Sequence, residues 1–169
     1  PGYLNNIVSG RIANRFNLKG TNCTVDAACA SSAAAFNLAI AELRLHRQDI
    51  VYTGGVDATG GITGYFSFAK THALSPSGDC RPFASDADGT ILGEGGAMVA
   101  LRRLEDAERD GDTIYAVLRD LGSSTDGRIK SIYAPSSDGQ SEAIRNAYGR
   151  IDYGMRDVEV IEAHGTGTV

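Results

Sequence analysis

The chain has 169 residues, 42% of them apolar, which is enough to form one domain with a hydrophobic core. A net charge of −5, with no basic run longer than Arg102-Arg103, argues against nucleic acid as a partner. No apolar run approaches the roughly 20 residues that cross a bilayer, and the 3 cysteines form neither an even set nor a Cys-x-x-Cys pair. We therefore expect no membrane segment, no disulfide framework or metal site, and a reducing cytoplasmic location.

The first part of the chain predicts two helices with a short strand between them. Apolar residues between Leu4 and Phe16 recur at helical spacing, and Gly20 is the expected stop. A strand is expected at 22–27. Residues 30–46 are Ala-rich and apolar on nearly every side, which predicts a central, buried helix.

The middle of the chain predicts two strands separated by a long loop. Residues 49–57 have the pattern of a strand rich in glycine, and 61–92 is a Gly/Ser/Asp-rich stretch with a short helical piece near 65–69. A loop of this length in a compact domain is usually functional or structured by its partners. A strand at 97–101 and a helix at 103–109 follow.

The last part predicts a strand at 114–121, a loop to about Asp138, a helix at 139–148 and a strand at 158–163. Strands and helices thus alternate along the whole chain. That order is typical of a layered α/β architecture with buried sheets.

Two residues are candidates for catalysis. Cys29 stands where an extended run meets the Ala-rich helix, and the unpaired N–H groups and positive dipole of a first helical turn favour the thiolate, which attacks carbonyl carbon. His164 lies between an apolar run and a Gly/Thr loop, a position that suits a strand end facing a cleft. Taken singly, the cysteine could be a small packing residue and the histidine a turn residue.

Together with their neighbours, these residues resemble the β-ketoacyl synthases, in particular the ketosynthase domains of polyketide and polyunsaturated fatty acid synthases. The similar stretches occur in the family's order from one end of the chain to the other. They are Asp26-Ala27-Ala28-Cys29-Ala30-Ser31-Ser32, residues 75–83 with 86–89 and 93–95, residues 126–128 with 134–135, and His164-Gly165-Thr166-Gly167-Thr168.

The resemblance implies a thiolase-like layered fold (αβαβα), of which residues 1–169 would be a single incomplete domain from the middle of a ketosynthase. It also implies decarboxylative Claisen condensation between an acyl group on Cys29 and a malonyl-type extender on acyl carrier protein. His164 would stabilise the negative charge that grows on the thioester oxygen of the extender. A second catalytic histidine and its lysine are expected beyond the end of this chain, so we expect the isolated chain to be inactive.

The same resemblance implies that Thr166 and Thr168 contact the phosphopantetheine arm supplied by the carrier protein, with local turn bonding as the alternative. No tightly bound cofactor is expected. The implied partners are acyl carrier protein, acyl and malonyl thioesters, and a second copy of the chain paired through the strand at 22–27.

Other polar residues have less specific interpretations. The resemblance makes Glu94 a structural carboxylate rather than a catalytic acid and places Cys80 outside the active site. His46 and His72 are interpreted as structural. Ala84 stands where the family commonly has Asp, which removes no catalytic atom.

Residues 109–115 and 130–135 look more like iterative polyunsaturated fatty acid or enediyne-type synthases than modular ones. Two other functions stay open. A thiolase shares the fold and cysteine but uses coenzyme A substrates without decarboxylation, and the 164–168 loop argues against it. A non-catalytic dimer partner would lack the nucleophile, so the presence of Cys29 argues against that role.

Overall fold

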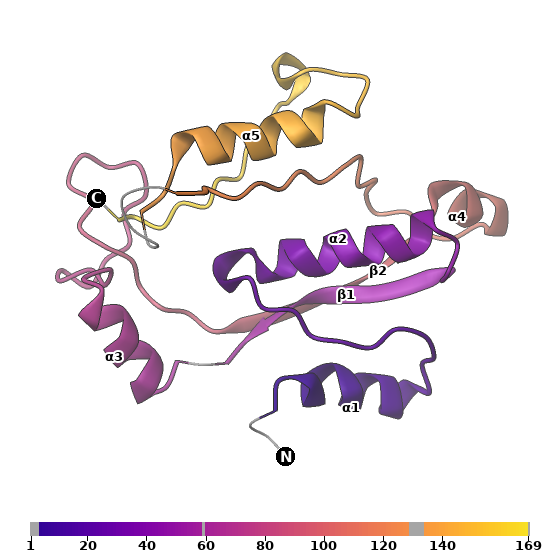
Figure 1. Cartoon of the computed structure of the whole chain (residues 1–169), viewed down its shortest axis with the longest axis horizontal. Coiled ribbons are helices and arrows are strands. Elements are labelled where there is room, and N and C mark those ends of the chain that lie inside the picture. The colour runs from indigo at the N-terminus through magenta and orange to yellow at the C-terminus, as the bar shows by residue number, and fades with distance from the viewer. Residues whose placement is uncertain (1–3, 59, 129–133, 169) are drawn as a thin grey trace. The chain divides into compact units, whose positions relative to one another are not determined.

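The computed structural model describes residues 4–58, 60–128 and 134–168 (Figure 1). They form two compact units, Pro1–Leu101 with Glu162–Val169, and Arg102–Ile161. Residues 130–133, part of the stretch similar to iterative synthases, lie outside the described residues. In the part of the chain that the structure describes, no helix has the length and apolar character needed to span a bilayer.

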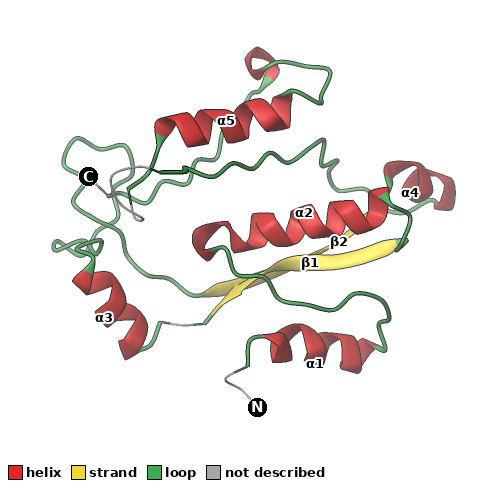
Figure 2. Cartoon of the chain, viewed as in Figure 1, coloured by secondary structure: helices red, strands yellow, loops and turns green. Residues whose placement is uncertain are grey.

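The first unit contains most of the regular structure (Figure 2). Its elements are α1 (Asn6–Phe16), a 3₁₀ turn (Ala28–Ala30), α2 (Ser31–Arg44), β1 (Ile50–Asp57), α3 (Ile62–Lys70) and β2 (Gly95–Arg102), whose last residue belongs to the second unit. These confirm the helices and strands predicted in this region except for the strand at 22–27, and α3 is longer than the helical piece expected near 65–69.

Helix α1 ends before the residue predicted to stop it. Asn17 adopts a left-handed conformation, with φ of 52°, and its N–H donates to the carbonyl oxygens of Ala13 and Asn14. Asparagine tolerates this conformation better than most residues other than glycine. Asn17 therefore caps the helix, and the prediction that Gly20 ends it is wrong.

Strands β1 and β2 pair in an antiparallel register. A side chain at Gly54 would collide with Ala97 of β2, while Gly96 lies against Val56. Residue numbers in β1 therefore increase as the numbers of their neighbours in β2 decrease, which is the antiparallel arrangement. The neighbouring Gly55 lies under α2, where an added Cβ would be 3.1 Å from Ser32 Cβ. The glycines of β1 therefore admit the partner strand and the helix at close range.

Helix α2 packs on β1, with Ala39 and Leu43 as its buried residues. The exposed fraction is 6% for Leu43 but 47% for Leu38 and 58% for Leu45. The predicted central, buried helix is therefore buried only in part within the described chain, on the face that packs against β1.

Three predicted strands are not formed among the described residues: those at 22–27, 114–121 and 158–163. A strand is defined by hydrogen bonds to a neighbouring strand, and an apolar pattern does not supply that neighbour. Val160 and Ile161 are 82% and 80% exposed. Residues 20–25 and β1 line the same groove of about 810 Å³. Among the described residues β1 pairs with β2 and not with the expected strand.

The second unit contains α4 (Leu104–Asp110), α5 (Ser137–Tyr148) and a 3₁₀ turn (Met155–Asp157). The helices predicted at 103–109 and 139–148 are confirmed. Serine begins α5, since the Ser136 hydroxyl accepts a hydrogen bond from the N–H of Gly139 at 3.2 Å.

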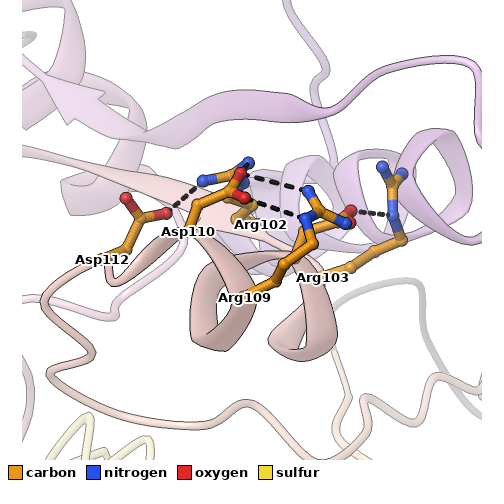
Figure 3. A network of polar contacts seen from close by, with 6 residues as sticks. Arg102, Arg103, Arg109, Asp110 and Asp112 are labelled. Atoms are coloured by element: carbon orange, nitrogen blue, oxygen red, sulfur yellow. Dashed lines mark hydrogen bonds and ion pairs between the residues drawn. The ribbon is translucent and has the colours of Figure 1, made fainter.

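Ion pairs surround α4 in this unit (Figure 3). Arg102 binds both Asp110 and Asp112, and Asp110 also binds Arg109. Asp106 is buried and accepts hydrogen bonds from Arg103 and Arg109. The Arg109 hydrogen bond is the largest cause that holds the pKa of Asp106 below its ordinary value. A buried carboxylate with two guanidinium partners stays charged.

Another ion pair of this unit joins segments far apart in the sequence. Arg150 Nε lies 2.6 Å from Asp120 Oδ2, and the same guanidinium donates to the carbonyl oxygen of Leu121 at 3.0 Å. The extended segment before Asp120 is thereby tied to the residues that follow α5.

Replacing Leu43 with alanine tests the packing of α2 on β1. Leu43→Ala should lower the free energy of unfolding by about 2–3 kcal/mol, because it removes buried methyl groups and leaves a cavity. Leu45→Ala, at the exposed end of the same helix, should change it by less than about 0.5 kcal/mol. Urea titration measures both values, and equal losses would contradict this packing.

Candidate functional site

Cys29 lies in a single 3₁₀ turn that leads directly into α2. Two side chains hold the turn. The Asp26 carboxylate accepts from the N–H of Ala28 at 3.0 Å, and the Ser31 hydroxyl accepts from Ala27 N–H at 2.9 Å while donating to the Ala28 carbonyl at 2.7 Å. The position of Cys29 at a helical N-terminus, expected from the sequence, is confirmed.

The backbone N–H of Cys29 is left without an acceptor in this turn. The N–H groups of Ala27 and Ala28 bind the side chains of Ser31 and Asp26, and those of Ala30 and Ser31 donate to the carbonyl oxygens of Ala27 and Ala28. Within the described chain, Cys29 N–H makes no such bond, and its side chain is exposed. In this arrangement the thiol of Cys29 can attack a carbonyl carbon, and the free N–H of the same residue can bind the resulting oxyanion.

The turn is also strained. Ala28 has φ of 50°, in the left-handed region that residues with a Cβ rarely adopt. Such strain persists where the surroundings impose it, and it is common next to reactive side chains. Two features supply that constraint. Asp26 and Ser31 make hydrogen bonds to the turn, and Ser32 packs closely against Gly55.

The histidine loop, His164–Thr168, depends on its two glycines. Gly165 and Gly167 have φ of 55° and 72°, and between them the chain turns so that the hydroxyls of Thr166 and Thr168 lie 2.9 Å apart. His164 is exposed, and its imidazole makes no hydrogen bond within the described residues. The loop thus presents one imidazole and two hydroxyls that are hydrogen-bonded to each other, the local turn bonding that was the alternative interpretation of these threonines.

A distant stretch supports the histidine loop. Gly89 N–H donates to the carbonyl oxygen of Gly167 at 3.0 Å, and the Cys80 thiol, 86 residues before Thr166, donates to that residue's carbonyl oxygen at 3.4 Å. A Cβ on Gly167 would lie 2.8 Å from Gly89 O and 3.1 Å from Cys80 Sγ. Cys80, expected outside the site, therefore contacts the loop, because the chain folds residues 80–89 against it.

The supporting stretch is itself held by a cluster of polar side chains. The Ser75 hydroxyl donates to Asp88 at 2.6 Å and accepts from Asp79 N–H at 3.2 Å. Arg81 lies 3.4 Å from Asp88 and 3.5 Å from both Asp79 and Asp86. We call Ser75, Asp79, Arg81, Asp86 and Asp88 the polar cluster.

Hydrogen bonds in the polar cluster shift the titration of Asp88. The Ser75 hydroxyl, then that of Ser77 and the charge of Arg81, hold the pKa of Asp88 below its ordinary value of 3.8. Asp88 therefore stays ionised at neutral pH, where it pairs with Arg81.

The sequence-predicted catalytic residues fall in one compact unit. Cys29 and His164 both belong to Pro1–Leu101 with Glu162–Val169, and no hydrogen bond joins the two side chains within the described chain. The structure brings Thr166 and Thr168 together. Nowhere in the described residues do three or more cysteine, histidine, aspartate or glutamate side chains gather in a way suited to hold a metal ion.

The residues given structural interpretations have structural contacts. Glu94 Oε1 accepts from the N–H of Gly60 at 2.8 Å, ahead of α3. His46 and His72 have φ of 52° and 56° and follow the ends of α2 and α3. Each histidine therefore lies where the chain turns away from a helix.

Sequence reasoning missed the supporting residues. It gave no role to Ser31, Ser75 or Arg81, and it separated Cys80 from the site. A local signal existed only for Ser31, which stands within hydrogen-bonding reach of the turn that it holds. Nothing in the sequence indicates that residues 80–89 meet residues 166–167.

Two family models match the chain. The model described as "Beta-ketoacyl synthase, N-terminal domain" matches residues 1–107, and "Beta-ketoacyl synthase, C-terminal domain" matches residues 115–169. Among similar proteins, a component of the polyunsaturated fatty acid synthase of Thraustochytrium is 45% identical over 168 residues, and polyketide synthase GfsA of Streptomyces halstedii is 38% identical over 167. The alignments cover 99% of this chain but 6% and 2% of those proteins.

Solved structures agree with these matches. A ketosynthase from module 6 of the Bacillus subtilis bacillaene synthase superposes with a TM-score of 0.90 and 36% identity, over 96% of this chain and 29% of that one. An oxazolomycin ketosynthase domain from Streptomyces albus gives 0.92 and 33%, over 96% and 29%. The expected thiolase-like α/β fold is thereby confirmed, although the prediction of a single domain stays untested.

Alanine at Gly167 tests the contact between the two stretches. Gly167→Ala should lower the free energy of unfolding by roughly 2–4 kcal/mol, because the left-handed φ and the contacts with Gly89 and Cys80 both oppose a Cβ. Gly78 is the matched control, since its φ is 82° and its Cβ would meet nothing within 4 Å. Gly78→Ala should lower the free energy of unfolding by only about 1–2 kcal/mol, the cost of a left-handed backbone for a residue with a Cβ. Equal losses in urea titrations would refute the close approach.

Acid should loosen the polar cluster. A carboxyl with a lowered pKa stabilises the folded state above its ordinary value of 3.8 and loses that contribution as the pH falls through the lowered value. The amide chemical shift of Gly89, followed by NMR, should therefore be constant above pH about 4 and change below it. In Asp88→Asn this step should vanish, and an unaltered step in that variant would assign it to another carboxyl.

Proposed function

Because the chain belongs to the β-ketoacyl synthase family, we propose that it forms part of a ketosynthase that condenses a cysteine-bound acyl group with a malonyl-type extender on acyl carrier protein. The family consists of condensing acyltransferases. The chain covers 29% of the solved bacillaene and oxazolomycin ketosynthases, so its activity, substrates and partners are proposals for the complete domain. The second histidine and lysine are expected outside these residues, and the chain alone should be inactive.

The observation that carries the proposal is the turn at Cys29. Its thiol is exposed at the start of α2, and its N–H is free of any acceptor within the described chain while the neighbouring N–H groups are occupied. A packing cysteine needs neither feature. A nucleophile that forms a tetrahedral intermediate needs both.

In the first half-reaction, the Cys29 thiolate attacks the carbonyl carbon of an acyl thioester. The new carbon–sulfur bond forms as the old one breaks, and the carrier leaves as a thiolate that takes up a proton from solvent. The N–H of Cys29 donates to the oxyanion during the transfer. This support resides in the Asp26–Ser31 turn and does not involve the histidine loop.

In the second half-reaction, the malonyl group loses carbon dioxide. The bond between its carboxylate and α-carbon breaks, and the electron pair moves toward the thioester oxygen. His164, donating one N–H, stabilises that negative charge. The α-carbon then attacks the acyl carbonyl on Cys29, a carbon–carbon bond forms, and Cys29 leaves as a thiolate.

Thr166 and Thr168 are proposed to bind the amide groups of the phosphopantetheine arm. Their hydroxyls lie side by side, 2.9 Å apart, in the loop that carries the His164 imidazole. A hydroxyl can both donate and accept, which suits the N–H and C=O groups of an amide. The arm is delivered by the carrier protein with the substrate, so no resident cofactor is proposed.

A homodimer through residues 22–27 is also proposed. These residues are exposed and form no strand within the described chain. Pairing with the same segment of a second copy would supply the neighbour that a strand requires. A cytoplasmic location is proposed because the three cysteines are free.

The polyunsaturated fatty acid type of synthase is the proposed setting. The chain is 45% identical to the Thraustochytrium protein, whereas its identity to the polyketide synthases in the same comparison is 37–41%. The matching models of β-ketoacyl synthase favour condensation over a thiolase, and Cys29 favours an active enzyme over a non-catalytic dimer partner.

Separate assays of the two half-reactions test the proposed roles in the complete ketosynthase domain that carries this chain. Cys29→Ala should abolish acyl transfer to the protein, measured by intact mass. His164→Ala should keep acyl transfer and slow the release of carbon dioxide from malonyl carrier protein by about 100-fold or more, the usual cost of removing an oxyanion donor.

His46→Asn is the matched histidine control, because asparagine tolerates the left-handed backbone at that position. It should leave both half-reactions unchanged. Condensation at the wild-type rate in Cys29→Ala would contradict the assignment of Cys29 as the nucleophile. Decarboxylation at the wild-type rate in His164→Ala would contradict the assignment of His164 to the decarboxylation step.

A further inference from the structure

Cys80 is the side chain through which the supporting stretch contacts the histidine loop. Its thiol donates to the carbonyl oxygen of Thr166 at 3.4 Å. Beside this bond, Gly89 N–H donates to the carbonyl oxygen of Gly167 at 3.0 Å. Two consecutive carbonyl groups of the loop are therefore held by residues of the 80–89 segment.

The contact leaves little free space. A Cβ placed on Gly167 would lie 3.1 Å from Cys80 Sγ and 3.2 Å from the backbone nitrogen of Arg81. The loop backbone thus rests directly on residues 80–81. A larger side chain at position 80 that kept the direction of the thiol would displace the loop, and a smaller one removes part of its support.

Position 80 lies between members of the polar cluster. Arg81 pairs with Asp79, Asp86 and Asp88, and its Nη2 also donates to the carbonyl oxygen of Asp86 at 2.9 Å. These bonds fix the backbone on both sides of Cys80.

We propose that Cys80 is a positioning residue for His164. Its thiol fixes the Thr166 carbonyl, and with it the direction in which the loop presents the imidazole two residues earlier. The inference rests on the proposed function of His164, and it concerns the decarboxylation half-reaction alone.

Acyl transfer should be independent of Cys80. Asp26 and Ser31 hold the turn that carries Cys29 by hydrogen bonds, and Ser32 packs against Gly55 of β1. No hydrogen bond links this turn to residues 75–90 among the described residues. The two half-reactions therefore depend on separate sets of contacts, which makes a selective effect measurable.

The test uses the complete ketosynthase domain, with acyl transfer to Cys29 and carbon dioxide release from malonyl carrier protein measured separately. Cys80→Val should slow decarboxylation by about 10- to 100-fold, the cost of a misplaced catalytic group, while acyl transfer stays within about 2-fold of the wild-type rate. Cys80→Ala should give a loss of about 3- to 10-fold, the equivalent of one hydrogen bond. Cys80→Ser keeps a donor and should restore most of the rate.

Ala84→Val is the matched control, since it adds a similar branched side chain to the same segment at an exposed position. It should leave both half-reactions unchanged. Wild-type decarboxylation in Cys80→Val and Cys80→Ala would overturn the proposal, as would an equal loss of both half-reactions in these variants. If His164→Ala also decarboxylates normally, the proposed function itself fails; if only the Cys80 variants do, the positioning role alone fails.

Discussion

The hydrogen bond from Gly89 N–H to the Gly167 carbonyl joins two stretches that are far apart along the chain. Closing so long a loop costs conformational entropy, and one backbone bond contributes only about 0.5–1.5 kcal/mol. The Cys80 thiol and the ion pairs of Arg81 provide the remaining support. This contact therefore helps to fix the surface that the histidine loop presents.

The nucleophile turn is organised differently, since its support is local. Asp26 and Ser31 bind the backbone of the turn from within a few residues, and they hold Ala28 in a left-handed conformation that costs free energy. The close approach of α2 to β1 at Gly55 fixes the direction of the helix. The site thus combines a self-contained turn with a loop that depends on a distant segment.

Ion pairs are more numerous than buried apolar side chains among the described residues of the second unit. Ala107 is its buried apolar residue among those described, while Asp106 and Asp120 each bind arginine. Exposed apolar side chains remain at 114–118 and 160–161. These are the segments with a strand pattern, and they pair with no strand among the described residues.

The sequence alone determined the features that depend on residues close together in the chain. These are the helices, the strands β1 and β2, the position of Cys29 at the start of a helix, and the glycine-rich turn after His164. Helical hydrogen bonds and turn conformations are made within a few residues, so a local pattern is enough. Tertiary structure alone decided that Cys80 supports the histidine loop, that Arg81 gathers three carboxylates, and that the strand patterns at 22–27 and 158–163 stay unpaired among the residues that the structure describes. These outcomes depend on which distant residues meet, and a pattern of residue types along one segment carries no information about its partner.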